Sequence, residues 1–196
     1  FEDPSVYYVL TDFGGNGPST ILETVDGNYA RVEKNSGAET WAGVTIGSGA
    51  GFLNDIPITN TDTKMFVRVY VSGTTQTGIP IKLKIENSQD PTQSVETDTY
   101  TTVAGEWEIM EFDFSNESEG TAALNTNYVF DMASIFFDFG STGNQNTVYY
   151  FDNVSFGSPL NVDENLFLSY RVYPNPFTET INIYGIEEAE IIVVND

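Results

Sequence analysis

The sequence predicts an all-β fold, an antiparallel β-sandwich of the jelly-roll type. Thr, Val, Tyr and Phe recur in short alternating runs, and clusters of Gly, Asn, Asp and Pro separate these runs. No segment has a convincing helical pattern. The 196 residues are 40% hydrophobic and 14% aromatic, so the chain can bury a sizeable core without disulfides. Eight or more short strands suit two packed sheets.

The expected strands follow one another along the first part of the chain. They are residues 29–33, 40–46, 65–71, 81–86, 95–102, 108–114, 134–139 and 147–156. After Gly157 the density of aromatic residues falls, and residues 158–165 resemble a linker in composition. We therefore expect a β-sandwich over residues 1–157, a linker over 158–165, and the start of a small second β-sandwich over 166–196.

Period-two alternation divides three of these runs into an inner and an outer side. In 65–71 and 81–86 the inner side is aliphatic, whereas the outer side carries basic, acidic and aromatic residues. If these strands are neighbours in one sheet, their outer residues form one face. That face comprises Trp41, Arg68, Tyr70, Lys82, Lys84 and Glu86.

This mixture of side chains suits a sugar. An aromatic plane stacks on the C–H face of a pyranose, and charged groups exchange hydrogen bonds with its hydroxyls. The alternative is a solvated outer face with Lys–Glu cross-strand pairs and a tryptophan at its rim. Trp107, which precedes the run 108–114, is expected to close the edge of the core instead.

A calcium site is predicted from acidic and amide residues near the chain start and in the last long strand. The candidate ligands are Glu2, Asp26, Asn28 and Asp152. A carboxylate within the aromatic segment 149–154 is costly unless it is paired or bound to a metal. The alternatives are that Asp152 caps a turn with Asn153, and that residues 26–28 form only a hairpin turn. A metal here would be structural.

Charge and composition exclude several functions. The chain has seven Lys and Arg and 29 Asp and Glu, which gives a formal charge of −22. This charge repels nucleic acids and anionic membrane surfaces. No run of 18 apolar residues occurs, so we expect no membrane insertion. The chain contains no Cys and no His, which removes thiol catalysis, thiolate zinc sites and Ser–His triads.

Five stretches of the first domain resemble a jelly-roll carbohydrate-binding module of marine polysaccharide-degrading bacteria. They are residues 39–44, 82–87, 94–97, 105–108 and 149–154. The resemblance covers most of residues 1–157. It implies binding of a glycan along a sheet face and a structural calcium at the chain ends. Asp152 matches the Asp of that calcium motif, whereas Glu2 matches less clearly.

The tail resembles the C-terminal sorting domain of the type IX secretion system of Bacteroidetes. The resemblance rests on Val172-Tyr173-Pro174-Asn175-Pro176-Phe177 and on Ile181-Asn182-Ile183. It implies export across the outer membrane and a secreted or cell-surface location, with the secretion and surface-attachment machinery as partners. Only about the first third of such a domain is present, so we expect a truncated signal.

These features together predict a non-catalytic module that binds a neutral β-glucan such as laminarin. The basic residues Arg68, Lys82 and Lys84 favour the alternative of an anionic polysaccharide such as alginate, because they could hold a uronate or a sulfate. A glycosidase or lyase would need two carboxylates across a cleft, for which Glu86 is one candidate. A third possibility is an adhesion protein whose sandwich contacts protein.

Overall fold

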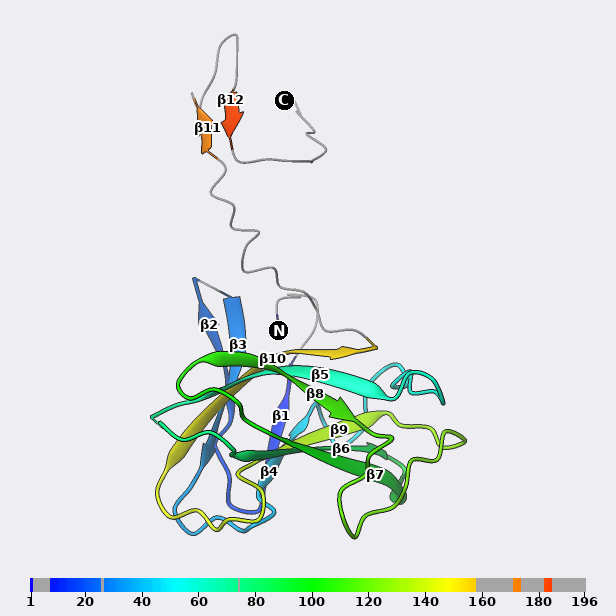
Figure 1. Cartoon of the computed structure of the whole chain (residues 1–196). Helices are drawn as coiled ribbons and strands as arrows, with labels where there is room; N and C mark the ends of the chain where they lie inside the picture. The colour runs from blue at the N-terminus through cyan, green and yellow to red at the C-terminus, as the bar shows by residue number, and fades with distance from the viewer. Residues whose placement is uncertain (2–7, 26, 74, 158–170, 174–181, 185–196) are drawn as a thin grey trace. The chain divides into compact units, whose positions relative to one another are not determined.

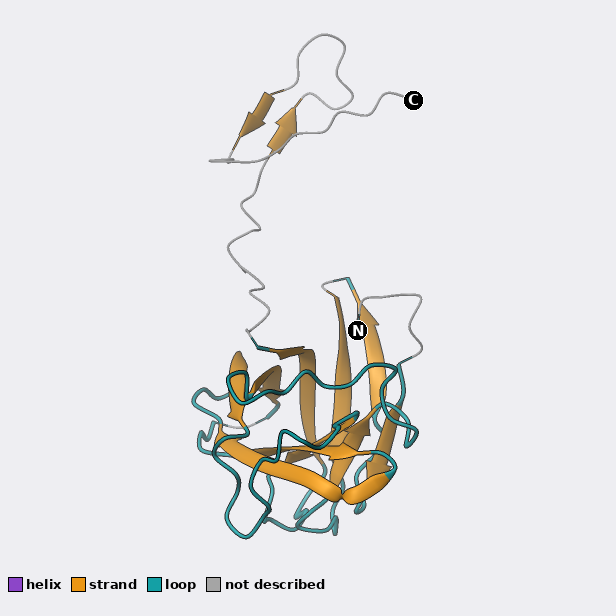
Figure 2. Cartoon of the chain, turned by 90° about the vertical axis from the view of Figure 1, so that its right-hand side faces the viewer, coloured by secondary structure: helices purple, strands orange, loops and turns teal. Residues whose placement is uncertain are grey.

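A computed structural model describes residues 1, 8–25, 27–73, 75–157, 171–173 and 182–184. Its first unit is a sandwich of two antiparallel five-stranded sheets, and its coloured parts contain strands and loops but no helix (Figures 1 and 2). Sheet A has the order β1-β4-β9-β6-β7, and sheet B has the order β2-β3-β10-β5-β8. The predicted fold class is confirmed.

The strands of sheet A are β1 (Leu10–Phe13), β4 (Gly43–Ile46), β6 (Pro80–Asn87), β7 (Asp90–Tyr100) and β9 (Met132–Phe137). The strands of sheet B are β2 (Thr20–Thr24), β3 (Gly27–Lys34), β5 (Lys64–Val71), β8 (Trp107–Asp113) and β10 (Thr147–Phe156). Seven of the eight predicted strands match an observed strand, and their ends agree to within about two residues. The one exception among these ends is the start of β7, which begins at Asp90 and not at residue 95. Residues 40–42 form a turn, and β4 begins only at Gly43. Strands β1 and β2 were not predicted.

The core lies between the two sheets and follows the predicted alternation. Met65, Val67, Val69 and Val71 of β5 face Ile81, Leu83 and Ile85 of β6 across the sandwich, and all are buried. Phe112, Phe137 and Phe151 complete it, and Phe137 stacks on Tyr149 with 4.8 Å between ring centroids. Burial of these side chains leaves the alternate positions of each strand on the outer faces.

Lys34 links the two sheets from inside the sandwich. It ends β3 of sheet B, is 1% exposed, and its Nζ donates hydrogen bonds to the carbonyl oxygens of Phe137 at 3.1 Å and Asp138 at 2.8 Å. These carbonyls lie at the end of β9 in sheet A, where Asp138 has φ 48°. Burial lowers the pKa of the Lys34 ammonium, and the carboxylate of Asp138 partly offsets this effect.

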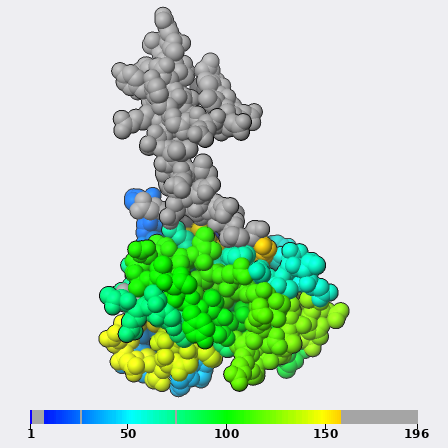
Figure 3. Space-filling view, in the orientation of Figure 1, coloured from blue at the N-terminus to red at the C-terminus, as the bar shows by residue number. Residues whose placement is uncertain are grey.

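The edge strands β7 and β8 lie on the same side of the sandwich. In the space-filling view, the green segment that contains them forms most of the surface facing the viewer (Figure 3). The loop after β8 covers the β7 edge, because Ser118 donates its backbone N–H to Glu96 O at 2.8 Å and its hydroxyl to Asp98. This loop blocks further strand pairing at that part of β7.

The chain divides into the units Phe1–Leu160 and Asn161–Asp196. The sequence-based boundaries place the end of the first domain at residue 157 and the start of the second at residue 166. In the second unit β11 (Arg171–Tyr173) pairs antiparallel with β12 (Asn182–Tyr184), with Val172 opposite Ile183. Residues 174–181, which carry most of the predicted sorting motif, lie outside the described residues. Among the residues that are described, no helix is long and apolar enough to cross a membrane.

Candidate functional site

The structure separates the predicted sugar-binding residues onto two opposite faces. Arg68 and Tyr70 lie on β5 of sheet B, whereas Lys82, Lys84 and Glu86 lie on β6 of sheet A. The expectation that these two strands are neighbours in one sheet is therefore wrong. The polypeptide crosses from one sheet to the other between residues 71 and 80, so strands that are consecutive in the sequence have outer sides that point in opposite directions.

The outer side of sheet A, which we call face A, combines a line of aromatic rings with charged groups. The rings of Trp41, Phe13, Phe136 and Phe139 contact one another in that order, with centroid distances of 6.3, 5.4 and 5.8 Å. The Nζ of Lys82 then lies 4.1 Å from the centroid of Phe139. Trp41 is 50% exposed, so the line begins with an accessible indole.

Two glycines allow this line of rings to form. Gly43 of β4 lies between the strands of Phe13 and Phe136, and a Cβ at this position would come within 2.7 Å of Phe13 Cζ and 2.9 Å of Phe136 Cδ1. Gly14, at φ 66°, lies beneath the indole, where a Cβ would be 3.1 Å from Trp41 Cε3 and 2.7 Å from Ala42 Cα. Only glycine leaves this space, so both positions shape the face.

Ion pairs occupy the centre of face A. Lys82 Nζ lies 3.0 Å from Glu96 Oε2, and Lys84 Nζ lies 2.6 Å from Glu86 Oε2. Lys82 is 5% exposed and Glu86 is 7% exposed, although both point away from the core. With Asp98, this part of the face carries two ammonium groups and three carboxylates. Of the two pairs, Lys82–Glu96 joins β6 to β7 as expected for cross-strand pairs, whereas Lys84 and Glu86 lie on the same strand β6.

The outer side of sheet B, which we call face B, carries a closed group of four rings. Tyr150, Tyr70 and Trp107 lie side by side on β10, β5 and β8, and Tyr29 of β3 contacts both Tyr150 and Trp107. The four centroid distances lie between 5.5 and 5.8 Å. The guanidinium carbon of Arg68 lies 4.7 Å from the Trp107 centroid.

Trp107 was expected to close the core, and that expectation is wrong. Met110 and Phe112 of the same strand are buried, and alternation therefore places Trp107 and Ile109 on the outer side. The same parity assigns Tyr150 outward between the buried Tyr149 and Phe151. Period two could have identified Tyr150 from its buried neighbours, and Trp107 by extending the alternation of Met110 and Phe112 back to the start of β8.

Two of the four predicted calcium ligands lie at one corner of the sandwich. The Asn28 amide donates to Phe1 O at 3.0 Å, and Asp152 Oδ1 lies 3.6 Å from the amino nitrogen of Phe1. Asp152 precedes a β-bulge in which Asn153 has φ 49°. The donor types suit calcium, since it takes carboxylate and amide oxygens. Glu2 and Asp26 lie outside the described residues, and no cluster of three acidic ligands occurs in the described part of the chain.

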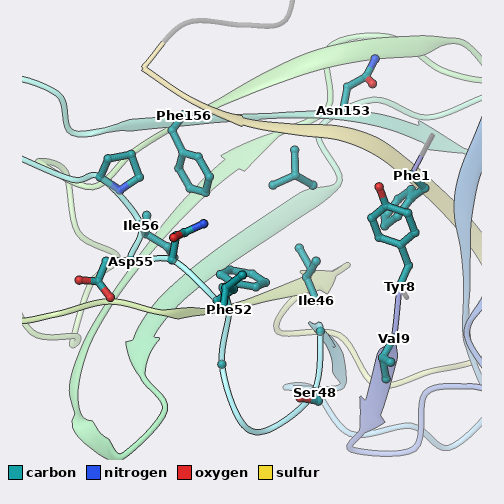
Figure 4. A pocket seen from close by; sticks show the side chains of 16 residues that line it. Phe1, Tyr8, Val9, Ile46, Ser48, Phe52, Asp55, Ile56, Asn153 and Phe156 are labelled. Atoms are coloured by element: carbon teal, nitrogen blue, oxygen red, sulfur yellow. The ribbon is translucent and has the colours of Figure 1, made fainter. Parts of the chain in front are cut away.

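A separate pocket of about 910 Å³ lies between β10, the loop that follows β4 and the residues before β1 (Figure 4). Its walls are mainly apolar and include Phe1, Tyr8, Ile46, Phe52 and Phe156. Asn153 and Val154 of β10 also line it, whereas the six predicted sugar-contact residues are absent from its walls. The pocket is thus distinct from both outer faces.

Comparison with solved structures identifies the fold as one used by carbohydrate-binding modules. The family 30 carbohydrate-binding module of a cellulosomal cellulase from Clostridium thermocellum matches 82% of this chain and 96% of its own, with a TM-score of 0.50 and 9% identity. An arabinose-bound GH51 α-L-arabinofuranosidase matches 76% of this chain but only 23% of its own, with a TM-score of 0.50 and 11% identity.

The family 11 module from Clostridium thermocellum, solved with a β-1,3-1,4-mixed-linked tetrasaccharide, aligns with 82% of this chain and 95% of its own. Its TM-score is 0.49 and its identity is 12%. No family model matches the sequence, and no curated protein matches it. The likeness to the family 30 module, at a TM-score of 0.50 and 9% identity, shows the fold alone, a β-sandwich of the kind found in that carbohydrate-binding module.

Proposed function

We propose that residues 1–157 form a non-catalytic carbohydrate-binding module and that face A holds the glycan. The observation that carries this proposal is the exposed Trp41 indole at the start of a line of rings that runs into the Lys82–Glu96 and Lys84–Glu86 pairs. The indole offers a stacking plane, and the charged pairs offer donors and acceptors beside it. The likeness in fold to the family 30 module supports this function.

The ligand that we propose is a neutral β-glucan of the laminarin type. The three basic residues that favoured an anionic polysaccharide do not act together, because Arg68 belongs to the opposite sheet. The two remaining ammonium groups are each paired with a carboxylate. A uronate or sulfate would therefore meet a face whose charge is balanced or slightly negative, within a chain of charge −22.

Affinity electrophoresis in gels that contain laminarin or alginate tests this choice. We expect laminarin to retard the protein and alginate to leave its mobility unchanged at moderate ionic strength. A dextran gel serves as the control for retardation by viscosity. Retardation by alginate alone would overturn the choice of ligand, and lack of retardation by either polysaccharide would count against the proposal itself.

Each central carboxylate of face A already has a partner, and this supports binding over catalysis. Glu86 pairs with Lys84, Glu96 pairs with Lys82, and Asp98 accepts a hydrogen bond from Ser118. A glycosidase needs two carboxyl groups that are free to act on the glycosidic bond from either side of a cleft, whereas these groups are engaged in ion pairs and a hydrogen bond. Release of reducing ends from laminarin or alginate by the purified protein would contradict this assignment.

We further propose a structural calcium ion held by Asp152 and Asn28, with Glu2 and Asp26 as the other predicted ligands. We expect millimolar calcium to raise the melting temperature on the order of 5 °C relative to EDTA, since a ligand at 100 times its Kd adds about 2.7 kcal/mol. Asp152→Asn should remove most of this increase. Magnesium is the control ion, and an equal response to both cations would argue against a built calcium site.

The tail supports a proposal for location. Its resemblance to a sorting domain of the type IX secretion system suggests that the protein is secreted or held at the outer surface of the cell. In that setting the module would contact polysaccharides outside the cell. The secretion and surface-attachment machinery would be its second class of partner.

A further inference from the structure

We propose that face B is a second glycan-binding surface, so that the module holds two glycan segments on opposite sides of the sandwich. The proposal takes its class of ligand, a neutral polysaccharide, from the proposed function. It depends on different residues, namely Tyr29, Arg68, Tyr70, Trp107 and Tyr150. The two faces belong to different sheets, and the hydrophobic core separates them.

The composition of face B fits a sugar. Four aromatic rings form a continuous patch whose centroids are 5.5 to 5.8 Å apart. Three of them carry a phenol hydroxyl, and the guanidinium of Arg68 lies against the fourth. All five side chains are partly exposed. Each apolar plane thus has a hydrogen-bonding group next to it, which is the combination that a pyranose needs.

The extent of the patch favours a glycan over a protein partner. Charged pairs bound it at both ends, since Arg31 Nη2 lies 2.7 Å from Glu33 Oε2 and Lys64 Nζ lies 2.6 Å from Glu111 Oε1. A stable protein interface takes about 20–30 residues on each side. The aromatic patch of face B comprises only four rings and Arg68. An extended polysaccharide chain needs only a narrow strip of this kind.

The charges of face B favour a neutral ligand. Arg31 pairs with Glu33, Lys64 pairs with Glu111, and the Arg68 guanidinium lies against the Trp107 ring. An anionic glycan would gain little from this balance, whereas neutral hydroxyls can hydrogen-bond to both signs of charge. Since the sheets of a sandwich pack about 10 Å apart, one short oligosaccharide cannot lie along both outer faces. Two ligands, or two segments of a polymer, are required.

The two tryptophans of the chain allow the faces to be tested separately, because Trp41 belongs to face A and Trp107 to face B. Trp41→Phe leaves Trp107 as the single reporter, and Trp107→Phe leaves Trp41. Each variant is titrated with laminarihexaose while the tryptophan emission is recorded, with a dextran oligosaccharide as the control. We expect a saturable change in both variants.

Further variants connect each signal to its face. When Tyr150→Ala is added to Trp41→Phe, the Kd obtained from the Trp107 emission should rise at least about tenfold. When Tyr150→Ala is added to Trp107→Phe, the Kd obtained from the Trp41 emission should stay unchanged. Saturation of Trp41 with no response from Trp107 would overturn the second surface and leave the proposed function standing. A Trp107 response that survives Tyr150→Ala would also overturn it. Silence of both reporters would count against both proposals.

Discussion

Trp41→Ala should lower the affinity of face A for laminarin by about 10- to 100-fold. Each tenfold change corresponds to about 1.4 kcal/mol, and a central aromatic contact contributes on the order of 2 kcal/mol. Trp41 is half exposed and stacks on Phe13, so its removal deprives face A of its accessible plane without opening the core. Isothermal titration calorimetry with laminarin oligosaccharides measures the loss.

Trp41→Phe is the matched control, because it keeps a smaller aromatic plane at the same position. We expect it to retain a larger share of the affinity than Trp41→Ala, and we expect both variants to melt close to the wild type by circular dichroism. Wild-type affinity in Trp41→Ala would remove the indole from the binding mechanism. A large fall in melting temperature would assign Trp41 a role in folding instead.

Lys34→Ala should destabilise the module by on the order of 3–5 kcal/mol in urea unfolding. The substitution removes the ammonium group that donates to the carbonyl oxygens of Phe137 and Asp138, and the loss of such buried bonds costs about 1–3 kcal/mol. It also replaces a long buried side chain with a methyl group, and the resulting cavity adds a cost of its own. The same substitution removes the hydrogen bonds by which Lys34 of sheet B is joined to the end of β9 in sheet A.

Lys34→Met separates the two contributions, since methionine fills a similar volume but donates no hydrogen bond. We expect this variant to lose about 1–3 kcal/mol. The wild type should also gain stability relative to Lys34→Met as the pH rises toward 10. Because burial lowers the pKa of folded Lys34, the unfolded chain binds more protons in that window, and higher pH then favours the folded state. Equal pH dependence in both proteins would contradict this account.

The alternation of apolar and polar residues predicts the class of fold and the inner and outer sides of most strands. The alternation in 65–71 and 81–86 correctly placed Met65, Val69, Leu83 and Ile85 in the core. The same rule assigned Arg68 and Lys82 to outer sides. Short polar strands escaped this approach, because Leu10–Phe13 and Thr20–Thr24 contain too few apolar positions for a clear period of two. Their pairing with β4 and β3 is what makes them strands.

Which outer sides share a surface depends on how the strands are distributed between the two sheets. Period two reports whether a side chain points toward the core, but it does not report to which sheet the strand belongs. In this sandwich β5 and β6 follow each other in the chain and lie in opposite sheets, so the six predicted contact residues divide into Trp41, Lys82, Lys84 and Glu86 on face A and Arg68 and Tyr70 on face B. Contacts between strands far apart in sequence, such as Phe13 with Phe136 or Tyr29 with Trp107, arise from that topology.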